Sequence, residues 1–209
     1  MRLFVAIPVG EETRQELESL VAGLRRPGDH LKWTAPAGWH ITLAFLGNST
    51  ADQLRQLNGQ LGAVHSTEFP IHIAAPKIFD RAGALVVGVP LTPALEELQR
   101  AVTAATAACG FTPEARAYRP HLTLARARRG ERLNLRFDHA AKIAPFVAHE
   151  FALYESFLEP GGARYEAQAR FKLLIRPINN ASATPPFSAQ DAEKGGAWSQ
   201  HFGAGSIKS

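Results

Sequence analysis

Alternation between apolar and polar residues is clearest in two short stretches, 39–44 and 120–125. From His40 and from His121 the chain reads His-apolar-Thr-apolar-Ala. Successive side chains of a β-strand point to opposite faces, so each histidine shares a face with its threonine while the apolar pair anchors the other face. His65 also precedes a threonine by two residues, but polar residues replace the apolar pair. The pattern therefore predicts two strands that each present an imidazole and a hydroxyl group on one side.

The two stretches mark an internal repeat, because position 121 lies 81 residues after position 40 and other features recur at this offset. The corresponding segments are 3–7 and 84–88, 11–26 and 92–107, and 68–79 and 149–159. We interpret the chain as two copies of one ancestral β-α-β unit, in halves that cover about residues 1–80 and 82–175.

Three helices are predicted where apolar residues recur every three or four positions. The first covers residues 11–26. Thr50 and Gln53 have the spacing of a capping box before the second helix. Thr92 is the expected cap of the third helix, which stops at Gly110.

The strands are predicted where apolar, β-branched and aromatic residues alternate between turn signals. They cover residues 3–7, 31–34, 40–46, 69–79, 84–89, 119–127, 139–147, 149–158 and 163–174. The last two flank Pro160-Gly161-Gly162, which predicts a hairpin. Residues 128–137 are polar and are expected to form a loop, and residues 176–209, rich in Pro, Gly, Ser and Ala, a mobile or extended tail.

Composition favours a soluble protein rather than a membrane protein. The 209 residues are 45% hydrophobic and 20% charged, and no apolar run approaches the roughly 18 residues of a membrane helix. The N-terminal apolar run is better explained as the first strand than as a signal peptide. We expect a cytoplasmic monomer. Cys109 is the single cysteine, so an internal disulfide is excluded and a buried thiol is expected.

The charge of the chain permits an anionic partner without requiring one. The formal net charge is +4, and arginines crowd around the second histidine motif. These are Arg116, Arg119, Arg126, Arg128, Arg129, Arg132 and Arg136. They could form a solvated face or a rim that faces phosphate groups, and the sequence leaves both alternatives open.

Two histidines on matched strands could be core residues, metal ligands, or an acid and a base. Stable zinc sites usually have three or four protein ligands at recognisable spacing, and neither motif has such neighbours, so no metal or cofactor is expected. Imidazole has a pKa near neutral pH, so one histidine can donate a proton while the other accepts one. The hydroxyls of Thr42 and Thr123 can donate to phosphate oxygens, although threonine also simply suits strands. Phosphodiester cleavage or transfer uses all four residues.

Arg126 is the nearest candidate for stabilising the phosphate charge. Strict alternation from His121 places it on the opposite face, so it reaches the site only if the strand bulges or ends there. The nearby arginines should also lower the pKa of His121, which leaves His40 as the more easily protonated acid. Four aromatic residues could stack a base, with core packing as the favoured alternative: Trp33, Trp39, Phe45 and Tyr118.

The tetrapeptides His40-Ile41-Thr42-Leu43 and His121-Leu122-Thr123-Leu124 resemble the paired HxTx motifs of the two-histidine (2H) phosphoesterases. Segments 1–7, 44–47 and 119–126 are similar to the bacterial RNA 2′,3′-cyclic phosphodiesterases, historically called 2′-5′ RNA ligases. The resemblance covers about residues 1–175. It implies an α+β, bilobal, pseudo-twofold fold of two antiparallel sheets with outer helices and a central cleft lined by the motifs.

The resemblance also implies a reaction and its residues. The expected activity is metal-independent opening of a terminal 2′,3′-cyclic phosphate on RNA to a 2′-phosphate. His40 would be the proton donor and His121 the proton acceptor, while Thr42 and Thr123 bind the phosphate. Two alternatives stay open: joining of tRNA halves by the same site in reverse, and a non-catalytic RNA-binding module that uses only the arginine rim.

Overall fold

The structure of the protein is a computed structural model that describes residues 1–29, 31–128, 133, 143–159 and 162–175. These residues all belong to one compact unit. The predicted tail, residues 176–209, and most of the predicted loop, residues 128–137, lie outside the described residues.

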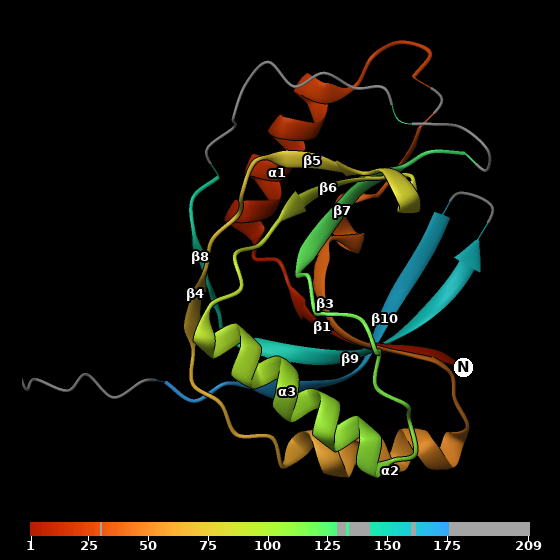
Figure 1. Cartoon of the computed structure of the whole chain (residues 1–209), viewed down its shortest axis with the longest axis vertical. Helices are drawn as coiled ribbons and strands as arrows, with labels where there is room; N and C mark the ends of the chain where they lie inside the picture. Colours follow the sequence, from red (N-terminus) through yellow and green to blue (C-terminus); the bar gives the residue numbers. More distant parts are fainter. Residues whose placement is uncertain (30, 129–132, 134–142, 160–161, 176–209) are drawn as a thin grey trace, which may run out of the picture. The chain divides into compact units, whose positions relative to one another are not determined.

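Two four-stranded antiparallel sheets carry the histidine motifs (Figure 1). The first sheet has the order β10-β9-β1-β3, with β10 at Gly162–Lys172, β9 at Glu150–Glu159, β1 at Arg2–Pro8 and β3 at His40–Asn48. The second has the order β2-β7-β6-β5, with β2 at Lys32–Trp33, β7 at His121–Arg126, β6 at Ala84–Gly88 and β5 at Pro76–Phe79. A separate antiparallel pair joins β4, Phe69–Ile71, to β8, Phe146–Ala148. The predicted α+β class with antiparallel sheets is confirmed.

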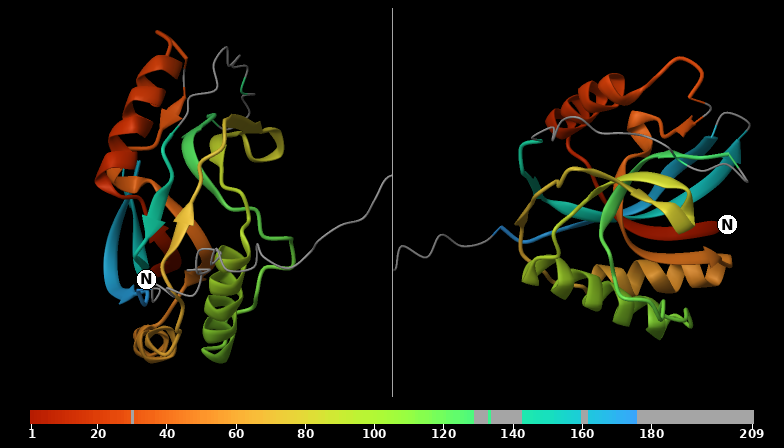
Figure 2. Two further views of the ribbon diagram at one scale, coloured as in Figure 1. Left: turned by 90° about the vertical axis from the view of Figure 1, so that its left-hand side faces the viewer. Right: turned by 45° about the horizontal axis from the view of Figure 1, so that its top comes forward.

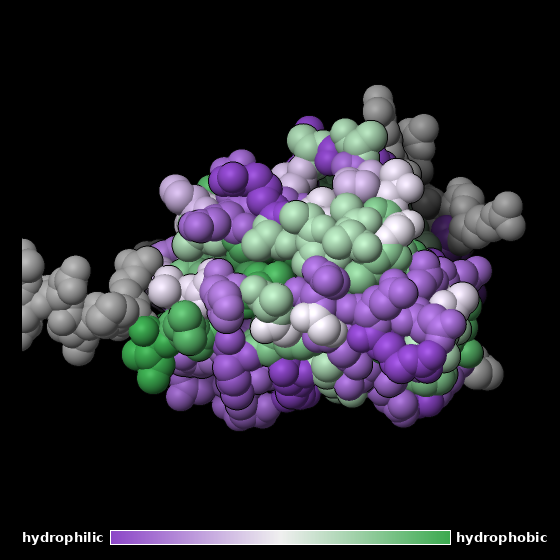
Figure 3. Space-filling model, turned by 90° about the horizontal axis from the view of Figure 1, so that it is seen from below, coloured by the Kyte–Doolittle hydropathy of each residue, from purple (hydrophilic) through white to green (hydrophobic). Residues whose placement is uncertain are grey.

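Three α-helices accompany the sheets: α1 at Glu11–Leu24, α2 at Ala51–Gly62 and α3 at Pro93–Ala108. The expected caps are present, since Thr50 and Gln53 form a reciprocal capping box and the Thr92 side chain accepts from the backbone N–H of Leu95. Helices α2 and α3 lie side by side and contact β10 and β3 respectively, while α1 lies at the other end against the short 3₁₀ helix η1, Pro36–Gly38 (Figure 2). Polar side chains cover most of the surface on which α2 and α3 lie (Figure 3).

The repeat is real, but its alignment is shifted by one residue in the first strand. In the first sheet Pro8 pairs with His40 and Ala6 with Thr42. In the second sheet Gly88 pairs with His121 and Val86 with Thr123. The motif strands therefore correspond at an offset of 81 and their partner strands at 80, so the alignment of 3–7 with 84–88 is wrong by one position.

The sheets do not coincide with the halves of the sequence. The first sheet combines β1 and β3 of the first half with β9 and β10 of the second half. The second sheet combines β2 and β5 of the first half with β6 and β7 of the second. The two halves thus exchange strands, and neither lobe can form from one half alone.

Two strand predictions need correction. The stretch 69–79 is not one strand but β4 and β5, because its first part pairs with β8 and its second part with β6. Within the predicted strand 139–147, residues 143–145 are not extended in a sheet and β8 begins only at Phe146; residues 139–142 lie outside the described part. Apolar alternation cannot show that two ends of a run pair with different sheets.

The core lies on the sheet faces opposite the histidines. Ile41 and Leu43 of β3, and Leu122 and Leu124 of β7, are buried in one apolar cluster that includes residues of all three α-helices. Cys109 is buried after α3, and burial raises the pKa of its thiol, as expected for a structural cysteine. Within the described residues, no helix is long and apolar enough to cross a membrane.

Candidate active site

The two histidine motifs meet although they belong to different sheets. Strands β3 and β7 are in contact, and the hydroxyl of Tyr118 donates to the backbone carbonyl of Thr42 at 2.9 Å, which ties the segment before β7 to β3. The charge of His121 also acts on the pKa of His40, so the two rings are close enough to interact. His40, Thr42, His121 and Thr123 are all partly exposed, whereas their alternate neighbours are buried.

Both imidazoles are held by the same local contact. Nδ1 of His40 lies 2.8 Å from the carbonyl oxygen of Gly38, and Nδ1 of His121 lies 2.7 Å from that of Arg119. A carbonyl can only accept a hydrogen bond, so Nδ1 carries a proton in each ring. This leaves Nε2 of each histidine as the atom that can exchange a proton with a substrate.

The surroundings of His40 make it hard to protonate. Its ring packs against Phe4 at 4.7 Å, edge-on against Tyr165 at 5.1 Å, and parallel to Tyr154 at 6.4 Å between ring centroids. Burial lowers the pKa of His40 from 6.5 to about 4; the Gly38 carbonyl opposes this shift and the charge of His121 adds to it. The prediction that His40 keeps its proton more easily is therefore wrong for the protein without substrate. Desolvation of the ring outweighs the number of cations nearby in the sequence.

A β-bulge decides where Arg126 points. Thr123 pairs with Val86 and Ala125 with Leu85, so Leu124 has no partner and the alternation shifts by one residue. Arg126 pairs with Ala84 and thus lies on the face of Thr123 rather than opposite to it. The strand thus has the bulge that Arg126 needs in order to lie on the same face as His121 and Thr123.

The charge of Arg126 affects the pKa of Tyr165, a residue of the first sheet. Burial raises the pKa of Tyr165, and Arg126 acts on it in the opposite direction. Because the Tyr165 ring packs against His40, this effect links Arg126 to the surroundings of the first motif. Strand β3 has the same bulge at Leu43, and the position that matches Arg126 is Phe45.

Of the four aromatic candidates, only Phe45 keeps an open ring. Its side chain is 69% exposed, and it lies 6.4 Å from Phe4. Trp39 is 4% exposed and belongs to the core. The Trp33 indole donates to Asp29 at 3.0 Å, and the Tyr118 hydroxyl is bonded to Thr42. Phe45 is therefore the aromatic residue best placed to stack on a base.

Several residues that line the site belong to neither motif and are brought there by strand pairing. Phe4, Tyr154 and Tyr165 surround His40, while Phe79 packs edge-on against His121 at 5.1 Å. Lys77 lies close to this part of the site, because its ammonium group is 5.3 Å from the centre of the Phe79 ring. The same group packs over Gly88, the partner of His121 in the sheet, where an added Cβ would come within 2.8 Å of it. Only the register of β5 on β6, of β9 on β1 and of β10 on β9 could have indicated these residues.

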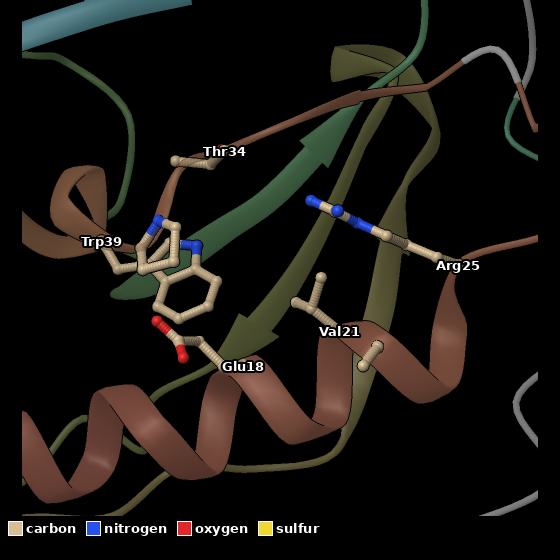
Figure 4. Close-up of a pocket in the computed structure, with 7 residues that line it drawn as sticks. Glu18, Val21, Arg25, Thr34 and Trp39 are labelled. Carbon is tan, nitrogen blue, oxygen red and sulfur yellow. The ribbon is translucent and has the colours of Figure 1, made fainter.

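Two hollows lie near the start of the motif strand β3, since Trp39, the residue before this strand, lines both. One, of about 470 Å³, includes His40. The other, of about 440 Å³, lies between α1 and η1 and is bordered by Glu18, Val21, Arg25, Thr34 and Trp39 (Figure 4). It contains neither histidine. Among the described residues, no group of three or more His, Cys, Asp or Glu is arranged to hold a metal ion.

Similarity to known proteins agrees with this arrangement. The RNA 2′,3′-cyclic phosphodiesterase of Bacillus subtilis is 32% identical over 154 residues, which cover 68% of this chain and 80% of that protein. The enzyme of the same name from Geobacillus stearothermophilus is 31% identical over 189 residues, 83% of this chain; the chain spans only 58% of that relative's length.

The fold is also shared with a solved structure. Escherichia coli LigT complexed with 3′-AMP superposes with a TM-score of 0.70 at 26% identity, covering 82% of this chain and 97% of that one. The family model described as LigT like phosphoesterase matches residues 7–84 and 87–165. The matched ranges include both HxTx motifs and most of the compact unit, and on this ground the chain belongs to the LigT-like phosphoesterase family.

Proposed function

We propose that this protein hydrolyses the 2′,3′-cyclic phosphate at the end of an RNA to a 2′-phosphate, with two histidines as acid and base and without a metal ion. The observation that carries the proposal is the matched pair of imidazoles, each anchored through Nδ1 and each with Nε2 available. The printed names of the Bacillus and Geobacillus relatives support the substrate class.

His121 is the proposed base. In its neutral form Nε2 accepts a proton from water, whose oxygen attacks phosphorus in line with the bond to the 3′ oxygen. His40 is the proposed acid, and its Nε2 proton passes to the departing 3′ oxygen as the P–O3′ bond breaks. The product carries a 2′-phosphate and a free 3′-hydroxyl, and exchange with solvent restores the proton on His40 and removes it from His121.

The low pKa of His40 is compatible with this role if the substrate itself raises it. An anionic phosphate beside the ring favours the imidazolium form, because an opposite charge within a few ångströms stabilises a cation. The burial that lowers the pKa of His40 also makes its imidazolium form a stronger acid. This form therefore gives up its proton readily as the leaving oxygen develops negative charge. Thr42, Thr123 and Arg126 are proposed to donate to the non-bridging oxygens.

The test is a cleavage assay in excess EDTA on a 5′-labelled oligoribonucleotide that ends in a 2′,3′-cyclic phosphate. His40→Ala and His121→Ala should each lower turnover by about 10² to 10⁴-fold. His65→Ala is the matched control, because His65 also precedes a threonine by two residues but lies exposed outside the motif strands. If chelator abolishes turnover and zinc or manganese restores it, the metal-free mechanism is wrong.

Product analysis tests the assignment of roles. Chromatography against authentic 2′- and 3′-phosphate standards should show the 2′-phosphate. A predominant 3′-phosphate would mean that His40 and His121 exchange roles or that the RNA end lies the other way round. A protein that binds the RNA equally well with and without its histidines, and never cleaves it, would be a binding module instead.

A further inference from the structure

His40 is part of the lining of the pocket of about 470 Å³. His40, Tyr154 and Tyr165 form the wall next to the proposed reaction site, and Arg14, Arg170 and Lys172 lie in the same lining. His121 and Thr123 are not part of it. The pocket therefore extends the site on one side only, away from the proposed base.

Strand pairing shows that these cations face the same space as the motif of β3. Arg170 pairs with Ala152, Ala152 with Ala6, and Ala6 with Thr42. Directly paired residues of an antiparallel sheet have their side chains on the same face. Arg170 and Thr42 thus project from one face with three strand spacings, about 14 Å, between their α-carbons.

The charges in this pocket are not balanced. Lys172 pairs with Glu150 across β10 and β9, and its Nζ lies 2.9 Å from the Glu150 carboxylate, which also binds Arg170. One carboxylate holds two cations, so the group keeps a net positive charge. Burial raises the pKa of Glu150, but hydrogen bonds from Lys172 and Arg170 more than offset it, so the carboxylate stays ionised and keeps both cations in position.

Arg14 adds an unsatisfied donor. Its guanidinium pairs with Glu11 at 2.6 Å and donates to the Val9 carbonyl at 3.3 Å, but its buried Nε has no hydrogen-bond partner among the described residues. Buried donors in folded proteins nearly always have an acceptor. The partly exposed guanidinium of Arg14 lies in the lining of the pocket, where it can face a ligand that brings acceptor oxygens.

We infer that the pocket binds the internucleotide phosphate on the 5′ side of the reacting RNA end. The inference rests on the proposed function and names its substrate class: oligoribonucleotides rather than single nucleotides. A phosphodiester supplies negative charge and acceptor oxygens for the guanidinium groups, and it follows the cyclic phosphate by one nucleotide. Tyr154 and Tyr165 line the same pocket and pack against His40, so a ribose or a base can stack on their rings next to the reacting end.

The experiment compares three substrates: adenosine 2′,3′-cyclic phosphate, the dinucleotide ApA with a 2′,3′-cyclic end, and the same dinucleotide with a neutral methylphosphonate linkage. We expect kcat/KM for the phosphodiester dinucleotide to exceed that for the methylphosphonate by about 10 to 100-fold, the usual effect of hydrogen bonds to a charged group. In Arg170→Gln this ratio should fall by about tenfold. Lys172→Gln, which leaves the Arg170 and Glu150 pair intact, should lower it in the same direction.

Arg55→Gln is the matched control, since Arg55 is an exposed arginine on α2 that pairs with Asp52 and lies outside the pocket. It should leave the ratio unchanged. If wild-type protein treats both dinucleotides alike while it cleaves all three substrates, the inferred subsite is wrong and the proposed function stands. If none of the three is cleaved, the proposed function fails and the inference fails with it.

Discussion

The burial of His40 predicts a specific loss of stability in mild acid. The unfolded chain binds a proton on this imidazole below pH 6.5, whereas the folded protein does so only near pH 4. Between these values the unfolded state holds more protons, so the free energy of unfolding decreases as the pH falls. From pH 7 to pH 5 the contribution of His40 alone is about 2 kcal/mol.

The assay is urea unfolding of wild-type and His40→Gln protein, followed by tryptophan fluorescence at pH 7 and pH 5. Glutamine keeps a polar side chain but does not titrate, so the variant should lose about 2 kcal/mol less than wild type over this interval. His65→Gln is the control, because His65 is exposed, and its pH dependence should match wild type. NMR titration of the His40 ring should place its pKa near 4 in the free protein and higher with a bound phosphate.

Two results would refute this reasoning. If His40→Gln shows the same pH dependence as wild type, the imidazole does not pay a desolvation cost on folding. If the His40 resonance titrates near its ordinary pKa of 6.5, water reaches the ring despite its contacts with Phe4, Tyr154 and Tyr165. Either outcome would also mean that the substrate does not have to raise the pKa of His40 before this residue can act as an acid.

Three further predictions concern the reaction and the fold. The rate of cyclic phosphate hydrolysis should depend on pH in a bell shape whose limbs belong to the coupled histidine pair, and a rate that rises steadily far above the imidazole range would contradict this. Arg126→Gln should lower kcat/KM by about 10 to 100-fold, whereas Arg116→Gln, an exposed arginine that pairs with Glu114, should have little effect; equal losses would argue for a general charge effect. Leu57→Ala removes a fully buried side chain and should cost about 2–5 kcal/mol in urea unfolding, while Leu158→Ala, 78% exposed, should cost within about 0.5 kcal/mol.

Local patterns predicted most of the elements. The capping box at Thr50 and the cap at Thr92 mark helix starts because they depend on residues only three positions apart. The antiparallel pairing of β9 and β10 follows from two alternating runs on either side of the sequence Pro-Gly-Gly. The stretch 69–79 was mispredicted as one strand because its alternation continues across the point where the chain leaves one sheet for another.

The sequence by itself determined which residues form the two motifs, because the order His-apolar-Thr-apolar requires one polar and one buried face wherever the strand lies. It also determined that the motifs are related, because their spacing recurs in the neighbouring elements. The sequence by itself did not determine the orientation of Arg126, which lies five residues after His121. Whether Arg126 faces the site depends on the unpaired Leu124, and a bulge is a property of two strands in register rather than of one sequence.

Only the tertiary structure decided how hard it is to protonate His40. The arginines near His121 in the sequence suggested that His40 is the more easily protonated of the two histidines. The pKa of His40 depends instead on its burial against Phe4, Tyr154 and Tyr165, which come from three other strands. The exchange of strands between the halves places β9 and β10 of the second half beside β1 and β3 of the first. The desolvation energy of a ring depends on every group that replaces water around it, and those groups are brought together only when the sheets assemble.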